Sequence, residues 1–303
     1  MVEATDKPLI IYDTSVILHK IVDLTQKDGK IKTKLTNKER DRRIKLGVDL
    51  YNTVYWGSNL PSDVDILWVG DNKTTNYWRV KSVRDYLNSL SPEDMAKLPP
   101  PISKGYKGNR FTEPYRTWCQ KRINKFSNCL SFPGYEADDV AAAVVKVLDN
   151  SRPVYLATVD SDWLQMVTEK VTWVCMTGFN PPIRDIDNGI MWLRGKIAKE
   201  TVNNKNKLLD EGITSQNLTI PDIIKYKCIT GDASDNLPPN CPRYFIDLFN
   251  PPKPYKLWEN EMFLDVWQEH IMEKEEDVIE ADNIMDDWME SYGWTNLTPT
   301  YFL

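Results

Sequence analysis

Carboxylates at the ends of apolar segments are the residues of this chain best suited to chemistry. Asp13, Asp71 and Asp160 directly follow the runs PLIIY, VDILWVG and VYLATV, and Asp162 lies two residues beyond Asp160. On extended backbone, side chains two residues apart point the same way. Carboxylate oxygens are the ligands that Mg²⁺ prefers. Two such ions about 4 Å apart can activate water and stabilise the leaving oxygen of a phosphodiester.

Two polar turns carry further acids: Glu136, Asp138, Asp139, Asp232 and Asp235. In the first turn, PGYEADD, Glu136 and Asp138 share a side only while the chain is extended, so we expect the following helix to begin near Asp138. Each acidic group alone has an ordinary explanation as a helix cap or a turn. Nine clustered carboxylates, however, need cations to offset their repulsion and burial. The set therefore predicts a divalent-metal centre for phosphoryl hydrolysis.

Histidine and cysteine usage excludes other chemistries. The chain has only two histidines, which argues against zinc sites built on His and Cys and against His-dependent triads. Its five cysteines show no C-x-x-C spacing, so we expect reduced thiols. No run of about 18 apolar residues is present, and the first residues lack the features of a signal peptide. These observations predict a cytoplasmic protein without a membrane partner.

Charge is unevenly distributed although the net charge is only −6. Residues 73–125 contain twelve Lys or Arg and four Asp or Glu, whereas residues 259–290 contain thirteen acids and one Lys. A basic block beside acidic regions is compatible with a nucleic-acid backbone lying along one face. A solvated basic loop is the alternative that charge alone leaves open.

The apolar runs that precede the aspartates predict the elements that position them. Residues 8–12, 64–70, 154–159 and 170–176 have the near-continuous apolar character of strands in a covered parallel sheet. Helical patterns alternate with them, at residues 44–56 and 139–148. The predicted fold is therefore α/β, and the carboxyl ends of its parallel strands share the edge where ligands bind.

Two regions depart from this alternation. Residues 72–130 form an excursion rich in Pro, Lys, Arg and aromatic residues. We divide the chain into a catalytic core, residues 1–236, and a C-terminal helical region, residues 237–303. In that second region, five residues at helical spacing predict one packed face: Met262, Phe263, Val266, Trp267 and Ile271.

The ordered motifs of the core resemble the 5′-nuclease superfamily of flap endonucleases and 5′→3′ exonucleases, closest to its phage ribonuclease H branch. The matching stretches cover roughly residues 8–237. They are the Asp13 strand end, Asp71-Asn72 with YWR, YKGNR, YEADD, DSD and GDASDN. This resemblance implies a PIN-like, mostly parallel sheet flanked by helices, with a helical arch formed by the excursion.

The resemblance also implies roles for the acids. Asp13, Asp71, Glu136 and Asp138, with Asp139 nearby, correspond to the ligands of a first Mg²⁺. The residues that correspond to the ligands of the second ion are Asp160, Asp162, Asp232 and Asp235. Mn²⁺ is expected to substitute for Mg²⁺ at both positions.

The excursion is implied to engage the nucleic acid. Lys107 and Arg110 correspond to the basic pair that meets the scissile phosphate, and Arg79 to a basic position at the base of the arch. Nearby basic and aromatic residues are expected to bind a single strand: Tyr77, Lys81, Arg84 and Tyr106. Interleaved charges and rings suit such a surface, although packing is the ordinary role of each ring.

One departure limits the resemblance. Family members follow the GDASDN-type turn with a Gly-rich helix–hairpin–helix that grips duplex and K⁺, whereas here no glycine occurs between Gly231 and Gly293. Backbone approaches phosphate closely where side chains are absent. The sequence therefore gives no support for the K⁺ site or for the usual duplex grip.

These observations predict a Mg²⁺-dependent 5′→3′ exonuclease or flap endonuclease that acts in replication or repair. The expected substrate is DNA or an RNA–DNA hybrid with a 5′ end or flap, including RNA primers. The expected enzyme is a monomer, in host cytoplasm if it is viral, with replication proteins as candidate partners. The alternatives are a PIN-domain ribonuclease acting on RNA and a nucleic-acid-binding scaffold without catalysis.

Overall fold

A six-stranded sheet forms the centre of the protein in a computed structural model that describes residues 7–18, 36–53, 61, 63–72, 77–97, 106–107, 114–126, 128–177, 181–251 and 255–272. The strands are β1 (Leu9–Asp13), β2 (Asp65–Val69), β3 (Cys129–Leu130), β4 (Val154–Thr158), β5 (Val171–Cys175) and β6 (Ile183–Arg184). Their order is β3-β2-β1-β4-β5-β6, and only the β5–β6 pair is antiparallel. The predicted mostly parallel α/β sheet is confirmed.

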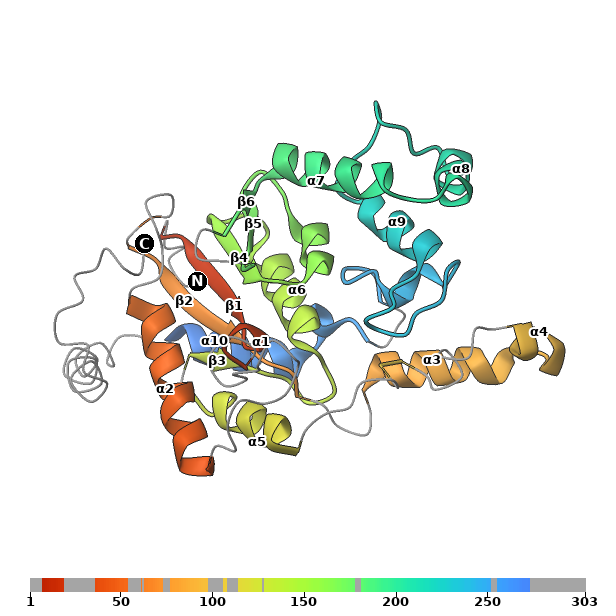
Figure 1. Cartoon of the computed structure of the whole chain (residues 1–303). Coiled ribbons are helices and arrows are strands. Elements are labelled where there is room, and N and C mark those ends of the chain that lie inside the picture. Colours follow the sequence, from red (N-terminus) through yellow and green to blue (C-terminus); the bar gives the residue numbers. More distant parts are fainter. Residues whose placement is uncertain are drawn as a thin grey trace.

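Helices flank the sheet and extend from it (Figure 1). They are α1 (Ser15–Ile17), α2 (Asn37–Thr53), α3 (Trp78–Ser89), α4 (Pro92–Lys97), α5 (Pro114–Ile123), α6 (Ala137–Leu148), α7 (Ile186–Ala198), α8 (Val202–Asp210), α9 (Asp222–Thr230) and α10 (Glu261–Met272). In the described part of the chain, short 3₁₀ helices lie at Ser161–Met166, Arg243–Phe245 and Leu257–Glu259. No helix in the described ranges is long and apolar enough to cross a membrane.

Alternate residues of the strands enter two separate cores, as the pleat of a sheet requires. In β1, Leu9 and Ile11 pack in the core on the α6 side. Ile10 and Tyr12 pack on the opposite face with α2 and α5. Both faces are therefore covered, which explains why the strands are apolar throughout instead of alternating with polar residues.

Helix α6 begins where its sequence predicts. Glu136 has extended backbone and precedes the first helical residue, Ala137. The carboxylate of Asp139 accepts a hydrogen bond of 3.1 Å from the Glu136 amide. Most of the helix is buried, and its small alanines allow close packing on the sheet. This start places Asp138 in the first turn, at the carboxyl edge of the strands.

Helix α10, in the C-terminal region, packs on the α6 side of the sheet. Phe263 and Trp267 of α10 are buried in the same core as α6. Met262 is 69% exposed and Val266 is 37% exposed, so the predicted packed face of this helix is narrower than its pattern suggested. Ile271 also belongs to α10, in the last part of the helix, whose side chains are not among those that the structure describes. The division of the chain at residue 236 stays a prediction.

Candidate metal and nucleic-acid site

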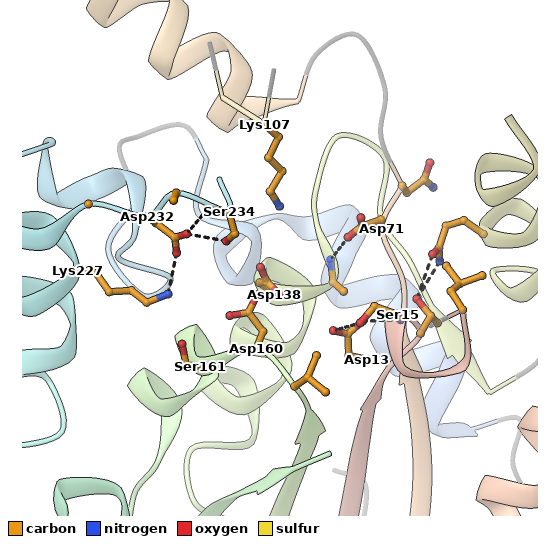
Figure 2. Close-up of a pocket in the computed structure, with 18 of the residues that line it drawn as sticks. Asp13, Ser15, Asp71, Lys107, Asp138, Asp160, Ser161, Lys227, Asp232 and Ser234 are labelled. Carbon is orange, nitrogen blue, oxygen red and sulfur yellow. Dashed lines mark hydrogen bonds and ion pairs between the residues drawn. The ribbon is translucent and has the colours of Figure 1, made fainter. Parts of the chain in front are cut away.

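A cavity of about 1080 Å³ opens at the carboxyl ends of β1, β2 and β4. Five aspartates line it: Asp13, Asp71, Asp138, Asp160 and Asp232. Four lysines also line it: Lys107, Lys121, Lys196 and Lys227. Since β2, β1 and β4 are neighbours in the sheet, the aspartates that follow them are brought together as predicted. Figure 2 shows Lys107 reaching toward these carboxylates from the opposite side of the cavity.

Asp13 is the last residue of β1, and neutral donors hold it in a fixed orientation. Its Oδ1 atom accepts a hydrogen bond of 2.8 Å from the Ser15 amide. Its Oδ2 atom accepts from the hydroxyls of Ser15 and Thr158 at 2.6 and 2.9 Å. Burial raises the pKa of Asp13 to about 6, and the charge of Asp71 also raises it, while the bonds from Ser15 and Thr158 act in the opposite direction.

Hydrogen bonds connect three further acids of the cavity to neighbouring segments: Asp71, Asp138 and Asp160. Asp71 Oδ1 accepts from the Ala137 amide at the start of α6, at 3.0 Å. Asp160 Oδ1 accepts from the Asp162 amide at 2.9 Å and so begins the 3₁₀ helix after β4. Burial, followed by the charge of Asp160, raises the pKa of Asp138 to about 8. Burial also raises the pKa of Asp160.

Glu136 and Asp139 lie behind the cavity, where they are paired with Arg79. The Arg79 Nη1 atom is 2.6 Å from Asp139 Oδ2 and 3.2 Å from Glu136 Oε2. Arg79 is only 2% exposed, and its Nε donates to the Phe245 carbonyl at 3.4 Å. The indole of Trp78 donates to the same oxygen of Asp139 at 3.1 Å.

This burial corrects the expectation that Arg79 contacts the nucleic acid. Its guanidinium compensates two carboxylates inside the protein, because burying them unpaired would be costly. Asp139 is likewise engaged by α3 and does not line the cavity. Lys81 and Arg84, on the same helix, are exposed and lie away from the cavity.

Tyr77 and Tyr106 are packed side chains, which corrects their expected role as stacking platforms. They are 4% and 8% exposed, and their ring centroids are 5.9 Å apart. The Tyr106 hydroxyl donates to Glu136 Oε2 at 3.0 Å or to Asp235 Oδ2 at 2.8 Å. Tyr106 therefore supports the carboxylates from inside the protein, and neither buried ring offers a face to a base.

Lys107 lies between two acids at the cavity. Its Nζ atom contacts Glu136 directly and is 3.6 Å from Asp235 Oδ2. Its amide donates to the Asp235 carbonyl at 2.9 Å, and its backbone has a φ of 52°. An unusual backbone conformation held at a cavity is typical of functional positions. Arg110, the expected partner of Lys107, lies outside the described residues.

Lys227 is a site residue that sequence reasoning missed. Its ammonium contacts Asp162 and lies 3.0 Å from Asp232 Oδ2. Asp232 also accepts from the amide and hydroxyl of Ser234, at 2.9 and 2.6 Å. The pKa of Asp232 is lowered: burial raises it, but Lys227 and Ser234 outweigh that effect.

A signal for Lys227 is present in the sequence. Ile223, Ile224 and Lys227 fall on one face of α9, and all three are buried. Lysine is rarely buried unless it is paired. A lysine in the apolar stripe of a helix that leads into an acidic turn therefore indicates an internal ion pair.

The donor set of this site fits a hard divalent cation. Asp13 is buried and Asp138 is partly buried, and both accept hydrogen bonds only from neutral groups among the described contacts. The pKa of each carboxyl is raised, mainly by loss of solvent around it. No three carboxylates of the described residues converge closely enough to ligate one ion directly. Mg²⁺ usually keeps several waters and needs only one or two direct carboxylate ligands, so the arrangement is compatible with it.

The comparisons with known proteins give structural likeness only. No protein-family model and no curated protein sequence matches the chain. Among solved structures, zinc-bound 5′-exonuclease of phage T5 is 15% identical, with 77% of this chain and 70% of that chain covered and a TM-score of 0.39. A T5 flap endonuclease complex with DNA and metal ions is 15% identical, with 98% and 91% covered and a TM-score of 0.38. The chemistry of this chain is therefore inferred from its own residues.

Proposed function

We propose that this chain is a divalent-metal-dependent nuclease that hydrolyses phosphodiesters at 5′ ends or 5′ flaps of DNA or RNA–DNA hybrids. One observation carries the proposal. Asp13, Asp71, Asp138 and Asp160 come from four separate elements and line one cavity, which they share with lysines. Carboxylates for cations and ammonium groups for phosphate are the two requirements of phosphodiester hydrolysis without histidine.

Asp13, Asp71 and Asp138 would hold the first Mg²⁺ or Mn²⁺, some of them through water. Asp160, Asp162, Asp232 and Asp235 form the group proposed for a second ion. A bound divalent cation would supply Lewis-acid stabilisation and a nucleophilic water at neutral pH. The remaining requirements fall to the protein, which orients the carboxylates and offsets the charge of the phosphate.

Lys107 is the residue proposed to meet the scissile phosphate. It faces the aspartates across the cavity, so a phosphodiester bound between them would bring its negative oxygens toward the Lys107 ammonium. Charge stabilisation at such a position is worth about 3 kcal/mol or more in related enzymatic sites. Cleavage in this orientation is expected to leave a 5′-phosphate and a 3′-hydroxyl.

The preference for 5′ ends is proposed from the sequence motifs alone. Two described helices of the excursion, α3 and α4, extend away from the sheet (Figure 1), whereas α5 packs against it. Exposed basic residues on α3, Lys81 and Arg84, remain candidates for contacts with a strand that approaches the cavity. Removal of primers or flaps during replication is the role that this preference implies.

One experiment separates the alternatives. End-labelled 5′-flap DNA, 3′-flap DNA, an RNA–DNA hybrid and single-stranded RNA are incubated with the protein in Mg²⁺, in Mn²⁺ or in chelator. We expect metal-dependent cleavage of the 5′ flap or the hybrid, and none for the Asp160→Ala/Asp162→Ala variant that remains folded by circular dichroism. Cleavage of single-stranded RNA alone would favour a PIN-type ribonuclease. Binding without cleavage in any metal would favour an inert scaffold.

A further inference from the structure

Two lysines that line the cavity each lie between two carboxylates from different parts of the chain. Lys227 contacts Asp162 and Asp232, and Lys107 contacts Glu136 and approaches Asp235. Three of these four acids belong to the group proposed for a second metal ion. In the protein without metal, therefore, ammonium groups already supply positive charge where a divalent cation would bind.

Arg79 provides an instructive contrast within the same site. It also lies between two acids, but it is fully enclosed, donates to the Phe245 carbonyl and does not line the cavity. Because several partners hold the Arg79 guanidinium and it does not border the cavity, its position is fixed. Lys227 is a point charge on a flexible four-carbon stem, and its side chain borders an open volume of about 1080 Å³. Lys227, unlike Arg79, therefore has open space into which its side chain can turn.

Lys227 lines the cavity and contacts Asp162. Asp232 lines the cavity, whereas Asp162 does not. The Oδ1 atom of Asp162 is buried and has no hydrogen-bond donor of ordinary geometry among the described residues, and the Lys227 ammonium that contacts it is its counter-charge. A cation entering from the cavity therefore meets the ammonium before it meets this oxygen.

We propose that Lys227 and a divalent cation compete for Asp162 and Asp232, so that this half of the site takes its ion only when the Lys227 side chain swings into the cavity. The inference rests on the proposed function and deepens it. Binding then occurs in two unequal steps. The first ion meets Asp13 and Asp138, which form no ion pair with a described residue, and the second ion must displace the Lys227 ammonium.

The test is calorimetric titration of Mn²⁺ into the full chain and into Lys227→Met, which keeps the length of the side chain but removes its charge. For Lys227→Met we expect the second dissociation constant to fall about tenfold or more, a change that corresponds to about 1.4 kcal/mol. The first step should change little. For Lys227→Gln, which keeps a hydrogen-bond donor, we also expect the second dissociation constant to fall. Lys225→Met is the matched control, since Lys225 is on the same helix but contacts Glu211 outside the cavity.

Thermal unfolding in increasing Mn²⁺ covers the case in which the metal-free variant is unstable. We expect Lys227→Met to unfold at a lower temperature than the wild type without metal and to gain more from Mn²⁺. The proposal is overturned if Lys227→Met and Lys227→Gln both bind the second ion as the wild type does, or if both stay unfolded in saturating Mn²⁺. If the wild type binds no divalent ion at all, the proposed nuclease function itself fails.

Discussion

The indole Nε1 of Trp163 donates a hydrogen bond of 2.7 Å to Oδ1 of Asp138. The two residues belong to different elements, because Asp138 is in the first turn of α6 and Trp163 is in the 3₁₀ helix after β4. Trp163 is fully buried, so its ring has little freedom. The bond therefore limits the directions that the Asp138 carboxylate can take, and it joins Asp138 to the segment that carries Asp160.

Trp163→Phe should weaken metal binding while leaving the cavity lining intact. Loss of a group that orients a ligand typically costs about 10- to 100-fold in metal affinity or activity. We expect the Mn²⁺ concentration for half-maximal cleavage to rise at least about tenfold. The control is Trp258→Phe, because Trp258 packs against Phe249 and does not border the cavity. Equal Mn²⁺ dependence in the two variants would contradict an orienting role for Trp163.

Lys107→Ala should lower turnover about 100-fold or more if Lys107 offsets about 3 kcal/mol of developing charge. Single-turnover cleavage of a labelled 5′ flap at saturating enzyme measures this effect separately from binding. Lys97→Ala is the control, because Lys97 is exposed on α4 and pairs with Glu93 and Asp94 of the same helix. Turnover within a factor of three of the wild type would remove Lys107 from the proposed mechanism.

Arg79→Met should destabilise the protein instead of selectively weakening its contact with nucleic acid. The change leaves Glu136 and Asp139 buried beside an apolar side chain, and breaking a buried ion pair costs about 3–5 kcal/mol. Urea unfolding should show this loss. Arg84→Met, on the exposed face of α3, should be close to neutral. Wild-type stability of Arg79→Met combined with lost substrate binding would restore the role that the sequence predicted.

The metal-free protein should lose stability as the pH rises from about 4 to about 8. Burial raises the pKa of folded Asp13 from 3.8 to about 6 and that of Asp138 from 3.8 to about 8. The folded state therefore holds protons that the unfolded chain has released, and the stabilisation present below pH 3.8 disappears as each group ionises. Mg²⁺ favours the ionised carboxylates, so it should raise the midpoint of thermal unfolding more at pH 8 than at pH 5. An equal rise at both values would argue against metal binding at these residues.

The strand-end aspartates were predictable because one physical rule places them. Apolar runs such as PLIIY indicate covered strands, and parallel strands end at a common edge, so Asp13, Asp71 and Asp160 had to be neighbours once the sheet was parallel. The start of α6 at Ala137 followed from the turn residues before it. The two-residue strands β3 and β6 were missed because such short segments carry no periodicity.

The partners of buried charges could not be read from the sequence. Arg79 lies among basic and aromatic residues that resemble a binding surface, and only the packing of α3 against Glu136 shows that it is internal. The same holds for Tyr77 and Tyr106, whose burial depends on residues more than a hundred positions away. In these cases tertiary contacts, which no local pattern encodes, decided the role of the side chain.

The adjacency of β2, β1 and β4 has a consequence for how this scaffold can diversify. The aspartates of the cavity come from strand ends, the first turn of α6 and the turn after α9, and none comes from α3 or α4. Helix α4 and the part of α3 beyond Arg79 can therefore be lengthened, shortened or replaced to select another nucleic-acid shape, while Trp78 and Arg79 at the start of α3 keep their contacts with Asp139 and Glu136. The reactive core would keep its acidic residues in register, so specificity and chemistry can be altered independently.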